Sequence, residues 1–230
     1  MIVRMRIGGF QKLTLLDYPG EMACIVFAAG CDLRCPFCHN SGLLAGEAAV
    51  DEEEVFEYLK KRSGVLDGVV LTGGEPLMQE GVFAFAERVR GMGYKLKIDT
   101  NGTYPERLRE LIERGLVDYA AMDVKHVPEK YSLAAGVSAD TEKIKESIEI
   151  IKSADICREF RTTVVKGIHE PDDIVAAARL LSTDVPYYIQ SYRESEGVLM
   201  PEGLGAFSEE ELKDAVRRAS EFCANVRFRG

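Results

Sequence analysis

Three cysteines, Cys31, Cys35 and Cys38, lie within eight residues of one another and are the side chains of this sequence best suited to chemistry. Their spacing could place three thiols on one helix face, but Pro36 disfavours helix at Cys35 and supplies no amide donor. Gly30, directly before Cys31, allows the backbone to turn sharply. We therefore expect a loop that curls the three sulfur atoms around one compact group.

Three kinds of group could use these thiols. A structural zinc ion takes four ligands, usually from two paired knuckles. No second Cys-x-x-Cys occurs in the sequence. His39 directly follows Cys38, and adjacent residues are poorly placed to bind the same tetrahedral zinc ion. A redox Cys-x-x-Cys would leave Cys31 without a role. An iron–sulfur cube held by three thiolates leaves one iron open to another ligand. We favour the cluster and keep zinc and redox chemistry as alternatives.

Composition restricts the class of protein further. The 230 residues are 46% hydrophobic, which is enough for one well-buried domain. A formal net charge of −9 argues against nonspecific nucleic-acid binding. No apolar run approaches the length of a membrane span and no signal-peptide core is present, so we expect no membrane contact and a cytoplasmic protein. The isolated Cys24, Cys157 and Cys223 are expected to be small buried hydrophobic residues rather than ligands or disulfides.

Apolar strands alternate with helices around the cysteines. We expect strands at 22–27, 68–72, 94–98, 117–124, 157–165 and 187–190. We expect helices at 51–62, 79–92, 105–114, 141–152, 171–181 and 208–222, and a loop with some helix at 126–138. Asp51 with Glu54, and Ser208 with Glu211, predict capping boxes. Strand and helix alternate six times, which implies parallel strands with right-handed crossovers.

Six strand–helix units are too few for the closed eight-stranded TIM barrel. We therefore predict an α/β fold, a partial (β/α)6 TIM-like barrel of parallel strands that is open on one side. Residues 1–20 are expected to form an N-terminal arm or hairpin rather than core, residues 21–200 the partial barrel, and residues 201–230 a C-terminal helix and tail. No linker or low-complexity run divides the chain, so residues 1–230 are predicted to form a single domain.

Polar motifs follow five of the six expected strands. In chain order they are the cysteine loop, Gly73-Gly74-Glu75, Asp99-Thr100-Asn101, Asp123-Val124-Lys125 and Gln190-Ser191-Tyr192-Arg193. In barrels the active site lies at the C-terminal ends of the strands. Alternation also places Asp123 and Lys125 on the same side of their strand. The sequence therefore predicts one pocket that gathers these motifs around the cysteines.

Each motif also has a structural alternative. Gly73-Gly74 before a helix is commonly only a turn. The run 99–101 could simply cap the following helix. Arg161 lies inside an otherwise apolar strand, where a guanidinium requires a carboxylate partner, and it could be a satisfied arginine on an edge strand.

The pattern Cys31-x-x-x-Cys35-x-Phe37-Cys38 resembles the signature of the radical S-adenosylmethionine (SAM) superfamily. The resemblance implies a [4Fe–4S] cluster on the three cysteines, with SAM bound to the open iron through its amino and carboxylate groups. Reduction of the cluster then cleaves SAM to methionine and a 5′-deoxyadenosyl radical. The continuation His39-Asn40 is similar to activases that install a glycyl radical on a partner enzyme. Residues 8–20 resemble activators of anaerobic ribonucleoside-triphosphate reductase of the longer type.

The same resemblance assigns site residues. Those expected to bind the cofactor are Phe37, Gly73, Gly74, Glu75, Asp99, Thr100, Asn101, Asp123, Lys125 and Arg161. The Gly-Gly-Glu motif would hold the SAM amino group, with Glu75 near the sulfonium. The SAM carboxylate and a monovalent cation would be held by residues 99–101, Asp123 and Lys125. Arg161 would approach the same carboxylate. Two departures are that Arg193 stands near the place where pyruvate formate-lyase activase has a histidine, and that no cysteine-rich insertion follows residue 40.

We therefore expect a radical SAM oxidoreductase that installs a glycyl radical on a protein partner, such as an anaerobic ribonucleotide reductase. A low-potential donor such as flavodoxin or ferredoxin would supply the electron. Two alternatives stay open at this point. The first is the same radical chemistry on a small molecule, and the second is an iron–sulfur electron carrier without SAM turnover.

Overall fold

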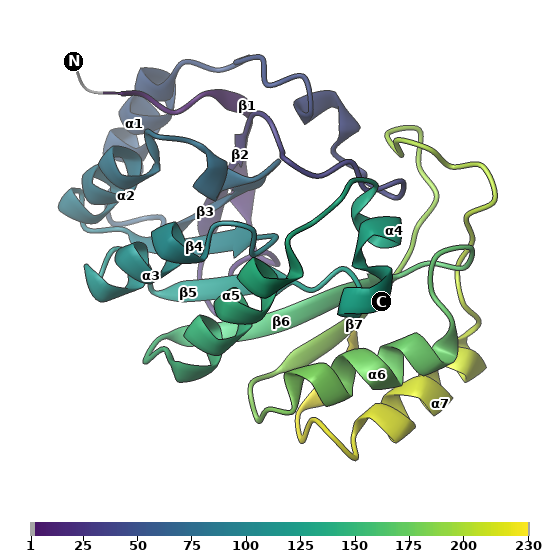
Figure 1. Cartoon of the computed structure of the whole chain (residues 1–230). Coiled ribbons are helices and arrows are strands. Elements are labelled where there is room, and N and C mark those ends of the chain that lie inside the picture. The colour runs from purple at the N-terminus through teal and green to yellow at the C-terminus, as the bar shows by residue number, and fades with distance from the viewer. Residues whose placement is uncertain (1–2, 230) are drawn as a thin grey trace.

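One eight-stranded sheet, with its strands in the order β1 to β8, forms the centre of the computed structural model, which describes residues 3–229 (Figure 1). The strands are β1 (Ile7–Thr14), β2 (Ala23–Ala28), β3 (Gly68–Gly73), β4 (Lys95–Thr100), β5 (Tyr119–Asp123), β6 (Cys157–Val164), β7 (Tyr187–Ser191) and β8 (Val226–Arg229). The first pair is antiparallel and each later pair is parallel. This confirms the predicted open partial barrel and adds one strand at each edge.

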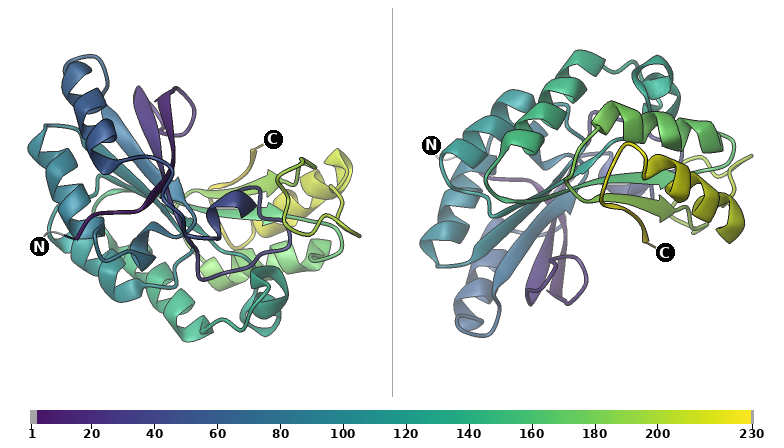
Figure 2. Two further views of the ribbon diagram at one scale, coloured as in Figure 1. Left: turned by 90° about the horizontal axis from the view of Figure 1, so that it is seen from above. Right: turned by 90° about the horizontal axis from the view of Figure 1, so that it is seen from below.

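Helices cover the outer face of this curved sheet, and β1 and β8 lie at its two opposite edges (Figure 2). The α-helices are α1 (Glu52–Lys61), α2 (Val82–Gly91), α3 (Pro105–Glu113), α4 (Tyr131–Ala135), α5 (Thr141–Ser153), α6 (Pro171–Leu181) and α7 (Glu209–Ala219). Short 3-10 turns, η1 (Ser41–Leu43), η2 (Pro76–Met78) and η3 (Pro128–Lys130), lie in three of the loops. None of the helices in residues 3–229 has the length and apolarity needed to cross a bilayer.

Side-chain alternation along the strands separates the main core from the barrel interior. Outward residues such as Leu71 and Phe160 are fully buried in the apolar core beneath the helices. On the inner face, Tyr18 and Ile25 belong to a second, smaller apolar cluster near the start of the strands. Further along, the inner face becomes polar. The apolar cluster therefore fills one end of the barrel and leaves the C-terminal ends of the strands for the site.

The two edge strands were not predicted. Residues 201–230 were expected to end in a tail, but β8 pairs with β7 along Val226–Arg229. Residues 1–20 were expected to lie outside the core, yet Met5 and Ile7 are buried in it. Gly8 and Gly9 both lie in β1, where a side chain on Gly8 would overlap Leu43. The sheet thus takes strands from all three expected parts of the chain.

Smaller differences concern helix ends and one cysteine. Asp51 caps α1 by accepting from the Glu53 amide, but the box with Glu54 is not formed. The box at Ser208 is formed. The second helix begins at residue 82 instead of 79, and η2 ends at Met78, so the residues 79–81 connect the two. Cys24 and Cys223 are buried as predicted, whereas Cys157 is exposed, contrary to the prediction.

Candidate active site

A pocket of about 740 Å³ lies at the C-terminal ends of the strands. Its size is that of a site for a cofactor or small ligand. The predicted site residues on its wall are Cys31, Cys35, Cys38, Phe37, Gly73, Gly74, Asp99, Thr100, Asn101, Asp123, Lys125 and Arg161. Glu75 lies outside this lining. The structure therefore brings together in one pocket all the predicted residues except that carboxylate.

The cysteine loop, residues 31–38, contains no helix or strand, as Pro36 predicted. Gly30 turns the chain into the loop with a φ of +88°, a conformation that favours glycine. The loop is fastened on two sides. Glu75 N donates to Gly30 O at 2.9 Å, and Arg34 N donates to Ala135 O at 2.8 Å. The end of β3 and the end of α4 thus fix where the three thiols lie.

The thiol set fits an iron–sulfur cluster by its chemistry. Burial raises the pKa of Cys31 to about 12, with Glu75 adding to the effect, and burial also raises the pKa of Cys35. Both groups are therefore neutral thiols near pH 7, and cluster binding must release their protons. Among residues 3–229, no three His, Cys, Asp or Glu side chains meet as ligands of a single metal ion. The fit rests on three thiols that share one pocket wall, one for each of three irons.

Gly73 and Gly74 are required by the packing of the chain against itself. Gly73 has a φ of +112°, and a Cβ there would lie 2.5 Å from Ala28 N. A Cβ on Gly74 would lie 1.9 Å from Gly30 O. Any side chain at either position would push the end of β3 away from the start of the cysteine loop. These glycines thus have a structural role in positioning the loop, in addition to lining the pocket.

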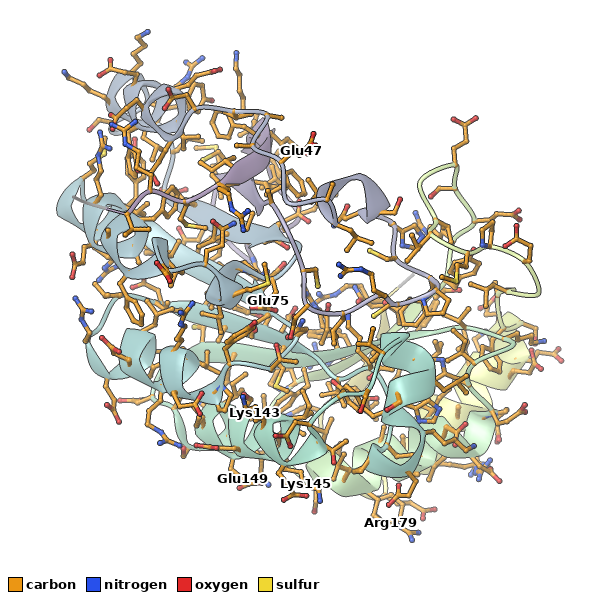
Figure 3. The ribbon with its side chains drawn as sticks, turned by 45° about the horizontal axis from the view of Figure 1, so that its top comes forward. Glu47, Glu75, Lys143, Lys145, Glu149 and Arg179 are labelled. Atoms are coloured by element: carbon orange, nitrogen blue, oxygen red, sulfur yellow. The ribbon has the colours of Figure 1, made fainter. Side chains whose placement is uncertain are left out.

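Glu75 is 0% exposed and lies in the interior, whereas Lys145 and Glu149 project from the surface (Figure 3). Its carboxylate accepts from Leu77 N at 3.0 Å, Thr100 Oγ1 at 2.9 Å and Asn101 N at 2.7 Å. These bonds tie the turn after β3 to the end of β4. Glu75 therefore lies behind the pocket wall, where its carboxylate holds the wall residues Thr100 and Asn101 in place.

Residues 99–101 do not cap the next helix, which was the structural alternative for them. The N-cap of α3 is Tyr104, and its side chain makes no cap hydrogen bond. Asn101 Nδ2 instead donates to Asp32 Oδ1 at 2.9 Å and lies 3.9 Å from Cys31 Sγ. The end of β4 therefore contacts the cysteine loop directly.

Burial raises the pKa of Glu75 to about 8, although its three donors favour the charged form. The ordinary value is 4.5, so between these two pH values the folded protein holds a proton that the unfolded chain has lost. The stability that protonated Glu75 contributes is fully present below pH 4.5, the ordinary pKa, and is lost as the pH rises through the folded-state pKa of about 8. We expect the unfolding free energy of the wild type, relative to Glu75→Gln, to fall between about pH 5 and about pH 8 in urea titrations. A difference that stays constant over this range would contradict the buried, protonated carboxyl.

Five charged side chains form a cluster on the inner face of β4 to β6. Asp99 pairs with Lys97 and with Arg161, whose Nη1 is 3.3 Å from Asp99 Oδ2. Asp123 accepts from Arg161 Nε at 2.8 Å and from Lys125 Nζ at 3.0 Å. The carboxylate partner expected for Arg161 is thus present twice. By formal charge the cluster holds three cations and two anions, and Lys125 and Arg161 are the two of its cations that line the pocket.

The ion pairs keep both carboxylates charged. Burial alone would raise the pKa of Asp99 and of Asp123, but Arg161, followed by the neighbouring lysine, lowers both pKa values below their usual range. Burial likewise opposes the charge of Arg161 and Lys125, and Asp123 raises the pKa of each above its usual value. The pocket wall therefore carries fixed charges, and its cations Lys125 and Arg161 suit an anionic group such as a carboxylate.

Two parts of the site were missed in the sequence. Lys97 was taken as part of a strand only, although alternation puts it on the face of Asp99 two residues later. The second part is the contact between the segment 192–200 and the cysteine loop, of which only Tyr192 and Arg193 belonged to a predicted pocket motif. Leu199 N donates to Cys38 O at 3.1 Å and Met200 N donates to Pro36 O at 2.9 Å. Two irregular loops that meet across 160 positions leave no periodic pattern, so no sequence signal could have found this contact.

The same segment places Arg193 on the pocket wall. His39, weighed above as a fourth zinc ligand, contacts the Arg193 carbonyl through Nε2 at 2.6 Å. Phe37 is buried within the cysteine loop, and its ring meets the edge of His169 at 6.2 Å between centroids. His39 and Phe37 thus connect the loop to its surroundings on two sides.

The fold and site together define an enzyme of the open-barrel class with a three-thiol cluster loop. The family model described as "Radical SAM superfamily" matches residues 25–181, and the chain belongs to that superfamily. Its members use a [4Fe–4S] cluster and SAM, for which this pocket supplies three thiols and the cations Lys125 and Arg161.

Named relatives divide between protein and small-molecule targets. The chain is 32% identical, over 97% of its length and 95% of the other protein, to a Methanocaldococcus jannaschii protein with the provisional name glycyl-radical enzyme activating enzyme. It is 32% identical to a pyruvate formate-lyase-activating enzyme of Clostridium pasteurianum over 55% of both chains. It is also 31% identical to a GTP 3′,8-cyclase of Aquifex aeolicus, over 73% of this chain and 54% of the cyclase.

Solved structures share the fold. A domain of a pyruvate-formate lyase-activating enzyme from Bacteroides vulgatus superposes with a TM-score of 0.58 at 19% identity, over 71% of this chain and 99% of that domain.

Proposed function

We propose that this protein is an activase that installs a glycyl radical on a partner enzyme, using a [4Fe–4S] cluster and SAM. The observation that supports the radical chemistry is the single pocket that joins Cys31, Cys35 and Cys38 to the charged cluster around Arg161. The near full-length similarity to a protein named for glycyl-radical activation supports the target.

The residues divide the work between them in this proposal. Cys31, Cys35 and Cys38 would hold the cluster, which when reduced supplies the electron that cleaves SAM to methionine and a 5′-deoxyadenosyl radical. Arg161 and Lys125 would provide positively charged donors for the SAM carboxylate. Gly73 and Gly74 keep the cysteine loop close to the end of β3, and Glu75 holds Thr100 and Asn101 in place. Phe37 contributes an apolar wall beside the thiols.

The partner that we propose is an anaerobic ribonucleotide reductase, with flavodoxin or ferredoxin as the electron donor. The resemblance of residues 8–20 to activators of that reductase supports the choice. Because the cluster must be reduced at low potential, we also propose a cytoplasmic location. Because β1 and β8 do not pair with each other, the barrel is open, and we propose that a glycine-bearing loop of the partner enters from this side.

The experiment that tests this target mixes the reduced, cluster-loaded protein with SAM and the glycyl-radical reductase of the same genome. We expect a doublet glycyl-radical EPR signal that requires both SAM and reductant. A partner in which the radical glycine is changed to alanine is the control and should give no doublet. If the wild-type partner stays EPR-silent while SAM is consumed, the assigned target is wrong.

A monovalent cation near Asp99 and Asp123 is a finer part of the proposal. Both carboxylates already have cationic side-chain partners, so any such ion must share them. We expect KCl in place of choline chloride, at equal ionic strength, to strengthen SAM binding by about threefold or less. No difference between the two salts in an equilibrium binding titration would remove the cation from the site.

A radical enzyme for a small molecule is the second candidate. The similarity to a GTP 3′,8-cyclase over 73% of this chain favours it. Incubation of the reduced protein with SAM and GTP, followed by mass spectrometry, separates the candidates. A product derived from GTP supports the cyclase-like reading, whereas unchanged GTP with a glycyl radical on the partner supports the activase.

A further inference from the structure

A buried carboxylate, Glu159, lies on the inner face of β6 next to the proposed SAM site. It precedes Arg161 by two residues, so both side chains are on the same face of the strand. The Glu159 side chain is 1% exposed. Tyr119 Oη donates to its Oε2 at 2.7 Å, and Arg229 donates to both of its oxygen atoms at 3.0 Å. A charge this deeply buried requires such partners.

Arg229 reaches Glu159 from β8, the last strand of the sheet. Its guanidinium lies 3.5 Å from the ring centroid of Tyr188 on β7, the strand between. The forked contact with Glu159 is the strongest geometry for an arginine–carboxylate pair. Stacking on one side and the fork on the other hold the guanidinium in place. Neither Glu159 nor Arg229 is among the residues that line the pocket.

Arg161 is the other cation within reach of Glu159. Its Nη1 is 4.0 Å from Glu159 Oε1 and 3.3 Å from Asp99 Oδ2, so the same nitrogen lies between two carboxylates. Without Arg229, Arg161 would be the guanidinium left beside a buried, uncompensated Glu159. Because attraction between buried charges is strong, Arg161 Nη1 would then shift toward the uncompensated Glu159 and away from Asp99.

We infer that Arg229 is a positioning residue for SAM binding, because its fork on Glu159 leaves Arg161 free to face Asp99, Asp123 and the pocket. The inference rests on the proposed function, in which Arg161 binds the SAM carboxylate. The C-terminal strand therefore supports the active site from outside the pocket.

The test compares SAM dissociation constants of cluster-loaded proteins, measured by equilibrium dialysis. We expect Arg229→Gln to weaken SAM binding by about tenfold or more, with iron content unchanged. The double variant Glu159→Gln/Arg229→Gln should return to within about threefold of the wild type, because the competing carboxylate has gone. Arg227→Gln is the matched control, since Arg227 is on the same strand but is exposed, and its affinity should be that of the wild type.

A merely structural role for β8 predicts a different pattern. Arg229→Gln would then lower the melting temperature with SAM affinity unchanged, or the double variant would bind SAM as weakly as the single one, and either result would overturn the inference. If Arg229→Gln does not fold, Arg229→Lys carries the test, because lysine keeps the charge but cannot form the fork. We expect it to bind SAM a few-fold more weakly, and wild-type affinity would overturn the inference. Wild-type protein that binds no SAM at all would instead refute the proposed function itself.

A crystal structure of the Arg229→Gln protein without cofactors gives a readout that does not depend on loading the protein with the cluster or with SAM. We expect Arg161 Nη1 to lie closer to Glu159 than to Asp99, the reverse of the wild-type order of 4.0 Å and 3.3 Å. An Arg161 side chain that keeps its wild-type position would contradict the competition.

Discussion

Replacement of Cys35 by alanine is expected to abolish the [4Fe–4S] cluster and all SAM cleavage. Cys35 is buried in the middle of the cysteine loop and lines the pocket beside Lys125. Without Cys35 the cluster keeps only two of its three protein ligands, and within residues 3–229 no further cysteine lies on the pocket wall. Anaerobic reconstitution should give about four Fe per wild-type chain, with an S = 1/2 EPR signal after dithionite, and neither in the variant.

Cys24→Ala is the matched control, because Cys24 is a buried cysteine of the strand that leads to the loop. It faces the main core, so the variant should reconstitute with the wild-type amount of iron. Full iron loading in the Cys35→Ala protein would refute the assignment of the cluster ligands.

The second large effect is expected for Arg161→Gln. This guanidinium is 13% exposed and partners both Asp99 and Asp123, so its removal leaves two partly buried carboxylates with only one lysine each. Loss of one partner from a buried ion pair costs about 3–5 kcal/mol of stability, and a partly buried pair costs less. The pocket wall also loses one of its cations. We expect a lower unfolding free energy in urea and SAM affinity reduced by about a hundredfold, with iron content unchanged.

Arg158→Gln controls for the loss of an arginine from the same strand. Arg158 is three residues earlier, on the opposite face, and donates to the carbonyls of Ile156 and Lys152. It should keep wild-type SAM affinity. If Arg161→Gln binds SAM as tightly as Arg158→Gln does, the charged cluster has no part in holding SAM.

The sequence predicted those features that local chemistry determines. Continuous apolar runs gave six of the eight strands, and the polar motifs at their ends gave the pocket wall, because parallel strands end at one edge of the sheet. Pro36 correctly predicted an irregular cysteine loop. Short edge strands such as β8 have too few residues for a clear period, and their pairing depends on the neighbouring strand.

Glu75 shows why roles are harder to predict than positions. A carboxylate next to two glycines after a strand matched a SAM-binding pattern, and the residue does lie within one hydrogen bond of the pocket residues Thr100 and Asn101. Its side chain, however, turns into the interior, where three donors converge on it. Which way a side chain turns at the end of a strand depends on partners distant in the sequence. For the same reason no local pattern connects Glu159 with Arg229, which are 70 positions apart.

Radical SAM activity is tested most directly by the release of 5′-deoxyadenosine from SAM by the reduced, cluster-loaded protein. We expect 5′-deoxyadenosine and methionine in equal amounts, formed only with reductant and not by the Cys35→Ala protein. A loaded and reduced protein that leaves SAM intact would contradict this activity and would point to an iron–sulfur electron carrier instead.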